Sequence, residues 1–207
     1  MLNAIVDLSH LNTVTDLAAA KNQGGILGVI HKATQGTSYR DPSYSSRRAQ
    51  ALAAGMLWGA YHFGTGGSGA DQATFFLSVV NPQPGEVIAL DFETNTTPGE
   101  ATMTLQEAEE FVATIHGRTG RWPGIYLNPS FLAGLVHGKD TLLANCWLWI
   151  ADWNAATPIV PPTWSTWTIW QYADNSQGPN AIPGIANCDR DRFNGDTAAL
   201  HAFWQSA

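Results

Sequence analysis

Positive charge is scarce in this chain. Lysine and arginine together number 10 among 207 residues, against 17 aspartate and glutamate residues, and the formal net charge is -7 at pH 7. Proteins that bind nucleic-acid phosphates need a basic surface. The composition therefore argues against a nucleic-acid partner.

Cysteines and long apolar runs are nearly absent as well. Cys146 and Cys188 are the only cysteines and form no CxxC pair, so no zinc site or redox motif is expected, and two buried thiols are favoured over a disulfide. No apolar run approaches the roughly 20 residues of a membrane helix, so no membrane insertion is expected. The first residues carry no signal-peptide pattern, which suits a cytosolic protein, export by another route, or a leader absent from this chain.

The chain does contain enough apolar residues for a sizeable core. Hydrophobic residues make up 44% of it, and the length fits one domain over residues 1–207. Nine tryptophans are many for this length. We expect most of them to fill the core and one or two to stack on sugar rings, whose C–H faces pack against aromatic planes.

Strand-like and helix-like segments alternate along most of the chain. The predicted strands are Ala4–Leu8, Gly25–His31, Leu57–Phe63, Val87–Glu93, Pro123–Leu127, Trp147–Asp152, Thr166–Gln171 and Ala186–Asp189. The predicted helices are Thr13–Asn22, Ser43–Ala54, Ala70–Val80, Leu105–Thr119 and Asp196–Trp204, with a short candidate at Pro129–Gly138. After Trp153 the connections are short or rich in proline and glycine, which leaves no room for packed helices.

This pattern predicts an α/β fold, a TIM-like β/α barrel with reduced or missing outer helices in its last third. The missing helices explain how a barrel fits into 207 residues when about 250 is typical. An open doubly wound sheet is the alternative, although no GxGxxG motif follows the first strand to support a nucleotide site.

Four acidic residues are expected to meet at one mouth of this barrel. Asp91 and Glu93 close the fourth strand and share one of its faces, since they are two residues apart. Asp7 lies at the end of the first strand and Asp189 at the end of the last, and functional side chains of barrels come from these strand ends. Taken alone, Asp7 could be a turn residue and Asp189 the partner of a neighbouring arginine, while Asp152 could belong to the rim or the site.

Crowded carboxyl groups cannot all ionise cheaply, so one of them should keep its proton near neutral pH. Glycoside hydrolysis uses such a protonated acid beside an ionised one. Glu93 has the longer reach and is assigned as the proton donor to the leaving oxygen, with Asp91 ionised. A metal site built from His31, His62 and Asp91 would indicate a metal-dependent hydrolase instead, but a packed or substrate-facing role is favoured for each histidine. No metal or cofactor is expected.

Several motifs, by their order and spacing, resemble glycoside hydrolase family 25, the lysozymes also called N,O-diacetylmuramidases. The resemblance covers nearly the whole chain and is carried by Val6–His10, Val29–Thr37, Gly59–Phe63, Leu90–Glu93, Gly124–Tyr126, Trp149–Trp153, Trp170–Tyr172, Asp189–Arg190 and Phe193. It implies a barrel with reduced late helices. It also implies cleavage, without a metal, of the β-1,4 bond between N-acetylmuramic acid and N-acetylglucosamine in bacterial peptidoglycan.

The resemblance also assigns roles to individual residues. Glu93 matches the family's general acid and Asp91 its partner carboxylate, while Asp7 and Asp189 complete the floor of the groove. The positions that match the sugar cleft are Tyr61, Phe63, Tyr126, Trp153, Trp170 and Gln171. The family is regarded as retaining, with the substrate's own acetamido group as nucleophile, and direct attack by Asp91 is the alternative.

Two positions depart from the family pattern. Gln35 stands where the usual Lys-Ala-Thr-Glu-Gly has Glu, which predicts an altered pH dependence. Leu11-Asn12 stand where Trp-Gln is frequent, which removes an aromatic sugar contact expected at that rim. We expect a monomer that acts on the cell wall as a phage-released endolysin, as a toxin of a secretion machine, or as a secreted enzyme. The alternative is a non-catalytic glycan-binding barrel, which the loss of a core acid would favour.

Overall fold

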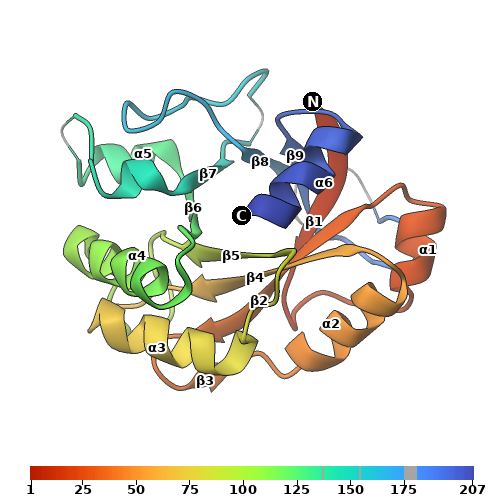
Figure 1. Ribbon diagram of the computed structural model, residues 1–207, viewed down its shortest axis with the longest axis horizontal. Helices are drawn as coiled ribbons and strands as arrows, with labels where there is room; N and C mark the ends of the chain where they lie inside the picture. The colour runs from red at the N-terminus through yellow and green to blue at the C-terminus, as the bar shows by residue number, and fades with distance from the viewer. Residues whose placement is uncertain (137, 154, 175–180) are drawn as a thin grey trace.

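A closed ring of eight strands forms the centre of the computed structural model, which describes residues 1–136, 138–153, 155–174 and 181–207 (Figure 1). The ring consists of β1 (Leu2–Leu8), β2 (Gly28–Gln35), β4 (Leu57–Phe63), β5 (Glu86–Asp91), β6 (Gly124–Leu127), β7 (Trp147–Ala151), β8 (Ile169–Ala173) and β9 (Asp189–Phe193). A short strand, β3 (Tyr39–Arg40), pairs antiparallel with β2 and lies outside the ring.

Two pairings of β1 close the sheet. On one side β1 runs parallel to β2, with Val6 opposite Val29, and on the other it runs antiparallel to β9, with Asp7 opposite Asp189. The neighbours from β2 through β8 are all parallel, whereas β9 is antiparallel to β8 as well. The predicted α/β barrel is confirmed. The alternative of an open doubly wound sheet is wrong, because an open sheet has two edge strands, whereas each of the eight ring strands pairs with a neighbour on both sides.

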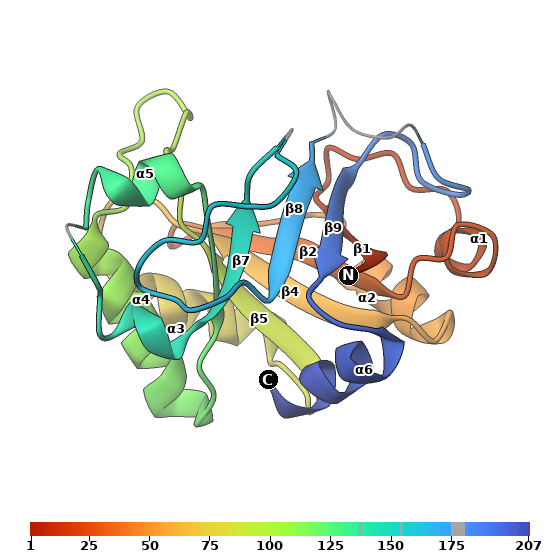
Figure 2. The same ribbon diagram turned by 90° about the horizontal axis from the view of Figure 1, so that it is seen from above.

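Helices cover the barrel mainly along the first part of the chain (Figure 2). They are α1 (Leu17–Asn22), α2 (Tyr44–Ala53), α3 (Gly69–Val80), α4 (Leu105–Thr119) and the short α5 (Pro129–Ala133), followed by a single 3₁₀ turn at Leu143–Asn145. Between β7 and β9 the described residues contain no helix, in agreement with the predicted loss of outer helices.

The last helix, α6 (Thr197–Ser206), closes the end of the barrel where the parallel strands begin. Its residues Leu200 and Trp204 are fully buried and pack with Ile5 inside the ring. The Trp204 indole N–H donates a hydrogen bond of 2.8 Å to the carbonyl oxygen of Trp58, at the start of β4. With this end sealed, the opposite end is the one left to carry a site.

Strand alternation produces two cores, one inside the ring and one between the ring and its helices. On β5, Val87 and Ala89 belong to the inner core, and Ile88 and Leu90 belong to the outer core. Successive side chains of a strand point to opposite faces, and both faces of a parallel barrel are covered. The apolar run before Asp91 is therefore a strand that is buried on both sides.

Helix α4 shows how local sequence sets these boundaries. The hydroxyl of Thr104 accepts a hydrogen bond from the Glu107 backbone N–H, and Glu107 Oε2 accepts one of 2.7 Å from the Thr104 N–H. This reciprocal capping starts the helix, and Gly120, with a φ of 71°, ends it in the left-handed region that glycine adopts readily. The predicted bounds Leu105–Thr119 agree with the structure.

Several predicted bounds differ from the structure. The strand that contains Asp91 ends at that residue, so Glu93 lies just beyond the strand rather than in it. The second strand is Gly28–Gln35 rather than Gly25–His31, and the first helix begins at Leu17 rather than at Thr13.

The last strand is Asp189–Phe193 rather than Ala186–Asp189, because its alternating acidic and basic residues conceal a strand whose acids face inward. The candidate helix Pro129–Gly138 ends at Ala133, and His137 lies outside the described residues. Cys146 and Cys188 are free and buried, as predicted.

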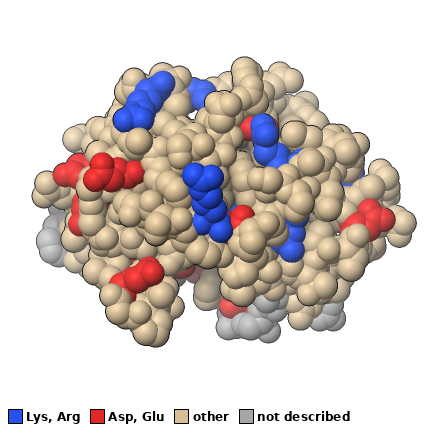
Figure 3. All heavy atoms as spheres, turned by 90° about the horizontal axis from the view of Figure 1, so that it is seen from below, with Lys and Arg blue, Asp and Glu red and all other residues tan. Residues whose placement is uncertain are grey.

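Charged side chains are sparse on the surface seen from below. In Figure 3, lysine and arginine side chains are scattered among uncharged residues and interrupted by acids, with no continuous basic surface on that face. Within the part of the chain that the structure describes, no helix is long and apolar enough to cross a membrane.

Candidate active site

A small polar pocket of about 90 Å³ opens at the end of the barrel where the parallel strands finish. Its lining consists of Asp7, Tyr61, Asp91, Glu93, Tyr126, Trp149, Gln171 and Asp189. The four acids predicted to converge therefore share one pocket. Three of the predicted sugar-contacting residues (Tyr61, Tyr126 and Gln171) lie there with them.

Asp189 reaches this pocket by a different route from the one expected. It was predicted at the carboxyl end of a strand, but it is the first residue of β9. Because β9 is antiparallel to β1 and β8, it begins at the mouth where those strands end. The pairing of Asp7 with Asp189 across the β1–β9 ladder brings the two residues together.

Gln171 holds one side of the pocket in place. Its Nε2 donates a hydrogen bond of 2.8 Å to Asp7 Oδ2. Its Oε1 accepts hydrogen bonds of 2.9 Å from the Tyr126 hydroxyl and from Trp153 Nε1. One amide thus fixes an acid, a phenol and an indole relative to one another.

Burial dominates the electrostatics of the pocket acids. It raises the pKa of Asp7 well above the usual range, the neighbouring carboxyl groups of Asp189 and Asp191 raise it further, and the hydrogen bond from Gln171 opposes the shift. Burial also raises the pKa of Asp91 well above its usual value, with Glu93 adding to the effect. Carboxyl groups in such surroundings retain protons at pH values where exposed ones have lost them.

Glu93 shares this behaviour to a smaller degree. Burial raises its pKa, Lys32 lowers it and Asp189 raises it. Asp91 is the more strongly shifted of the two, although Glu93 is the residue predicted to carry the proton. Because the charge of Glu93 raises the pKa of Asp91, the two groups titrate together rather than independently. Asp91 Oδ1 is buried and has no hydrogen-bond partner among the described residues.

Lys32, which is not among the predicted site residues, is a cation that balances these acids. Its charge favours the ionised forms of Asp91 and Glu93. Its Nζ donates a hydrogen bond of 2.6 Å to Gln35 Oε1 and lies 4.6 Å from the ring centroid of Phe63. The alternation of β2, which places Lys32 and His31 on opposite faces, is the signal that could have found it.

Gln35 connects Lys32 to the segment that follows β5. Its Nε2 donates a hydrogen bond of 2.9 Å to Glu100 Oε2, and Asn95 Nδ2 donates one of 3.1 Å to the same oxygen. The family pattern has a glutamate at the position of Gln35, next to Lys32. Here the carboxylate is that of Glu100, which is linked to Lys32 through Gln35. The predicted effect of Gln35 on pH dependence remains a prediction.

The aromatic residues divide between the pocket and the packed layers. Trp153 is 41% exposed beside Gln171, where its ring is accessible at the rim. Trp149, which was not predicted, lines the pocket. Phe63 lies against Lys32 rather than among the lining residues.

The placement of Trp170 in the sugar cleft is wrong. Trp170 is 1% exposed and packs in the outer core, with its indole N–H bonded to the Asp152 carbonyl oxygen at 2.9 Å. Adjacent strand residues face opposite sides, so Gln171 and Trp170 cannot both face the pocket. The Asp152 carboxylate accepts a hydrogen bond from the Ile159 N–H and supports the following connection.

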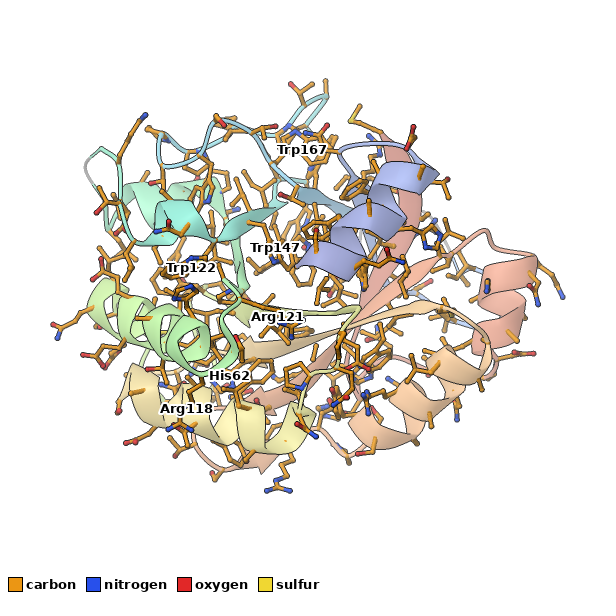
Figure 4. The ribbon with its side chains drawn as sticks, viewed as in Figure 1. His62, Arg118, Arg121, Trp122, Trp147 and Trp167 are labelled. Atoms are coloured by element: carbon orange, nitrogen blue, oxygen red, sulfur yellow. The ribbon has the colours of Figure 1, made fainter. Side chains whose placement is uncertain are left out.

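The histidines considered as metal ligands lie away from the pocket. His62 is buried between β4 and helices α3 and α4, where it stacks on Phe111 with ring centroids 5.0 Å apart (Figure 4). His31 stacks on Trp58 in the outer layer. Burial lowers the pKa of both to about 4. No group of three or more His, Cys, Asp or Glu side chains in the described ranges is arranged to hold a metal ion.

Comparison with known proteins gives consistent matches. Residues 6–181 match the family model for glycosyl hydrolases family 25. The chain is 31% identical to Lysozyme M1 of Streptomyces globisporus, over 95% of this chain and 69% of that protein. It is 32% identical to an N,O-diacetylmuramidase of Chalaropsis sp, over 81% of this chain and 86% of that protein.

Solved structures resemble the fold over its whole length. A bacterial lysozyme from Streptomyces coelicolor superposes with a TM-score of 0.87 at 29% identity, covering 99% of this chain and 97% of that one. A muramidase from Acremonium alcalophilum gives 0.85 at 31% identity, with both chains fully covered. A family GH25 lysozyme from Aspergillus fumigatus gives 0.84 at 29% identity, covering 100% of this chain and 99% of that one.

Proposed function

The chain belongs to glycosyl hydrolases family 25, the family of its lysozyme and muramidase relatives, and from this premise we propose that it cleaves the β-1,4 bond between N-acetylmuramic acid and N-acetylglucosamine in bacterial peptidoglycan. The observation that carries the proposal is the meeting of Asp7, Asp91, Glu93 and Asp189 in one pocket at the open mouth of the barrel. Buried carboxyl groups that share protons are the equipment of glycoside hydrolysis.

In the first step Glu93 donates its proton to the glycosidic oxygen as the bond from that oxygen to the sugar C1 breaks. The acetamido oxygen of the same sugar attacks C1, so that the positive charge developing on the ring passes to a cyclic intermediate. In the second step the ionised Glu93 takes a proton from a water molecule. The water oxygen attacks C1 and breaks the bond between C1 and the acetamido oxygen, which opens the ring of the cyclic intermediate but not the sugar ring. Two inversions at C1 yield net retention, and Glu93 ends with its proton restored.

Asp91 is suited to orient that acetamido group. Its buried Oδ1 lacks a hydrogen-bond partner among the described residues, and the acetamido N–H would supply one. A hydrogen bond to the ionised carboxylate favours ionisation. Substrate binding would therefore leave Asp91 ionised and assign the shared proton to Glu93, although burial alone raises the pKa of Asp91 more.

The other pocket residues would hold the sugar through hydrogen bonds and aromatic contacts. Asp7 and Asp189 face the same space and would accept hydrogen bonds from substrate hydroxyl groups. Tyr61 and Tyr126 line the walls, and the exposed ring of Trp153 offers a stacking surface at the rim. Because the pocket holds only about 90 Å³, we propose that it receives the reacting part of one sugar while the glycan strand lies across the mouth.

The test is to digest purified peptidoglycan, reduce the products with borohydride and identify the sugar at each new reducing end. Reduced N-acetylmuramic acid is the expected product. Reduced N-acetylglucosamine would show that a different bond is cut. Proton NMR of the first product formed tests retention, since a β anomer is expected and an initial α anomer would contradict the two-step scheme.

A further inference from the structure

A fifth carboxyl group lies beneath the pocket floor. Asp191 is 0% exposed and follows Asp189 by two residues on β9, so both point into the barrel. In the ladder with β1 it lies opposite Ile5, one layer below the pairing of Asp7 with Asp189. Trp149 Nε1 donates a hydrogen bond of 2.7 Å to Asp191 Oδ1.

The second oxygen of Asp191 lacks a protein donor. Asp191 Oδ2 is buried and receives no hydrogen bond from any described residue, yet the side chain lies within hydrogen-bond contact of Asp7. A buried, ionised carboxylate with an unfilled oxygen is costly. Two carboxyl groups in direct contact form a hydrogen bond only when a proton lies between them.

The charges around Asp191 favour a retained proton. Burial raises its pKa, and the negative charge of Asp189 raises it further. The Trp149 hydrogen bond, the contact with Asp7 and the positive charge of Arg190 lower it, and the resulting pKa is about 8. The same contact raises the pKa of Asp7, so the proton lies between the two carboxyl groups. The neighbouring groups contributed by β7 and β8, Trp149 and Gln171, carry no charge. Burial also raises the pKa of the Cys188 thiol, to about 12, so that this neighbour is uncharged too.

We propose that Asp191 is a positioning residue that shares one proton with Asp7, so that a hydrogen bond between the two carboxyl groups fixes the orientation of Asp7 in the pocket floor. Asp191 lies below the pocket and acts through Asp7 rather than on the sugar. Its effect on cleavage rests on the proposed function. The shared proton does not rest on the proposed function, because it follows from the burial and contacts of Asp191 in the folded chain.

The proposal makes the alkaline side of the pH–activity profile depend on Asp191. As the pH rises through about 8, the pair loses the shared proton, the hydrogen bond is replaced by repulsion, and Asp7 shifts. Wild-type activity should therefore fall with an ionisation near this pH. A wild-type profile without such an ionisation would overturn the proposal and needs no variant.

Two substitutions separate the proton from the side-chain volume. In Asp191→Asn the amide oxygen can accept from Trp149 and the amide N–H can donate to Asp7, so kcat should stay within a few-fold of wild type while the ionisation near pH 8 disappears. Asp191→Ala can donate nothing, and kcat should fall at least tenfold at every pH. An Asn variant with the wild-type alkaline limb, or an Ala variant with wild-type kcat, would contradict the assignment.

Thermal unfolding as a function of pH tests the proton without any substrate. Since the pKa of Asp191 is raised in the folded protein, its protonated form contributes stability below pH 4 that is lost as the pH rises toward 8 and above. The fall in melting temperature over this range should be smaller in Asp191→Asn than in wild type, and an unchanged fall would refute the retained proton. Asp41→Asn is the matched control, because the pKa of buried Asp41 is lowered and its removal should not reduce the fall. Failure of the wild type to cleave peptidoglycan would overturn the proposed function alone, since the unfolding measurement still decides the proton.

Discussion

Replacement of Gln171 by leucine removes the amide that joins three residues of the site while keeping a side chain of similar size. The hydrogen bonds to Asp7, Tyr126 and Trp153, at 2.8, 2.9 and 2.9 Å, are all lost. Trp153 is exposed enough to bond with water instead. Asp7 and Tyr126 are buried, and each group left without its partner costs about 1–3 kcal/mol.

The expected loss of stability is therefore about 2–6 kcal/mol, or a melting temperature lower by roughly 5–20 °C for a protein of this size. The hydrogen bond from Gln171 favours the ionised form of Asp7, and a hydrogen bond to a charged group is worth about 1.5–3 kcal/mol. Its loss from the pocket should lower kcat/KM by roughly 10- to 100-fold. Circular dichroism measures the melting temperature, and the release of reducing ends well below that temperature measures kcat/KM.

Gln72 offers a matched control away from the pocket. It is also buried and makes four hydrogen bonds, to His62 at 3.1 Å, to the Thr65 backbone at 2.8 and 3.0 Å and to the Thr65 hydroxyl at 3.5 Å. Gln72→Leu should lose comparable stability but keep kcat/KM within about twofold, because none of its partners lines the pocket. Equal losses of activity in the two variants, or full activity in Gln171→Leu, would refute the role given to Gln171.

Three further predictions concern charge, sugar contact and metals. Lys32→Met removes the cation that favours ionised Asp91 and Glu93, so their pKa values rise and the acidic limb of the pH–rate profile should move to higher pH; a move to lower pH would contradict this. Trp153→Ala should raise KM by about 2- to 10-fold through the loss of aromatic contact, while Trp170→Phe, in the outer core, should leave KM unchanged at some cost in melting temperature. Activity should be unaffected by EDTA, and a loss restored by added zinc would support the metal-dependent alternative.

The barrel and the convergence of its acids could be predicted because both depend on local patterns. Alternating strand and helix segments indicated the fold, and the run ending at Asp91 marked a buried strand with acids at its carboxyl end. Parallel strands of a barrel finish at a common mouth. Asp7, Asp91 and Glu93 were therefore placed by topology before any distance was known.

The last strand could not be predicted in the same way. Asp189–Phe193 alternates acidic and basic side chains, and charged residues are rarely buried unless they are paired. Asp191 is buried because Trp149 and Asp7 contact it from other strands, a condition that local sequence does not reveal. The antiparallel direction of β9, which brings Asp189 to the mouth, likewise depends on partners far along the chain.

Strand alternation in the sequence already separates Trp170 from the pocket and places Lys32 toward it. Gln171 and Trp170 are neighbours on β8, and strand alternation forbids that both face the pocket. The same rule on β2 separates Lys32 from His31, and the buried His31 ring leaves Lys32 to face the acids. A match to a family pattern does not by itself show on which face of a strand each residue lies.

Glu93→Gln provides the most direct test of the claim that these acids perform the cleavage. The substitution keeps the shape of the side chain but removes the proton that the mechanism transfers. The rate of reducing-end release from peptidoglycan should fall by about 10²–10⁴-fold with the melting temperature nearly unchanged, while the Glu110→Gln control on α4 keeps wild-type activity. A Glu93→Gln variant that releases reducing ends at close to the wild-type rate would contradict the account.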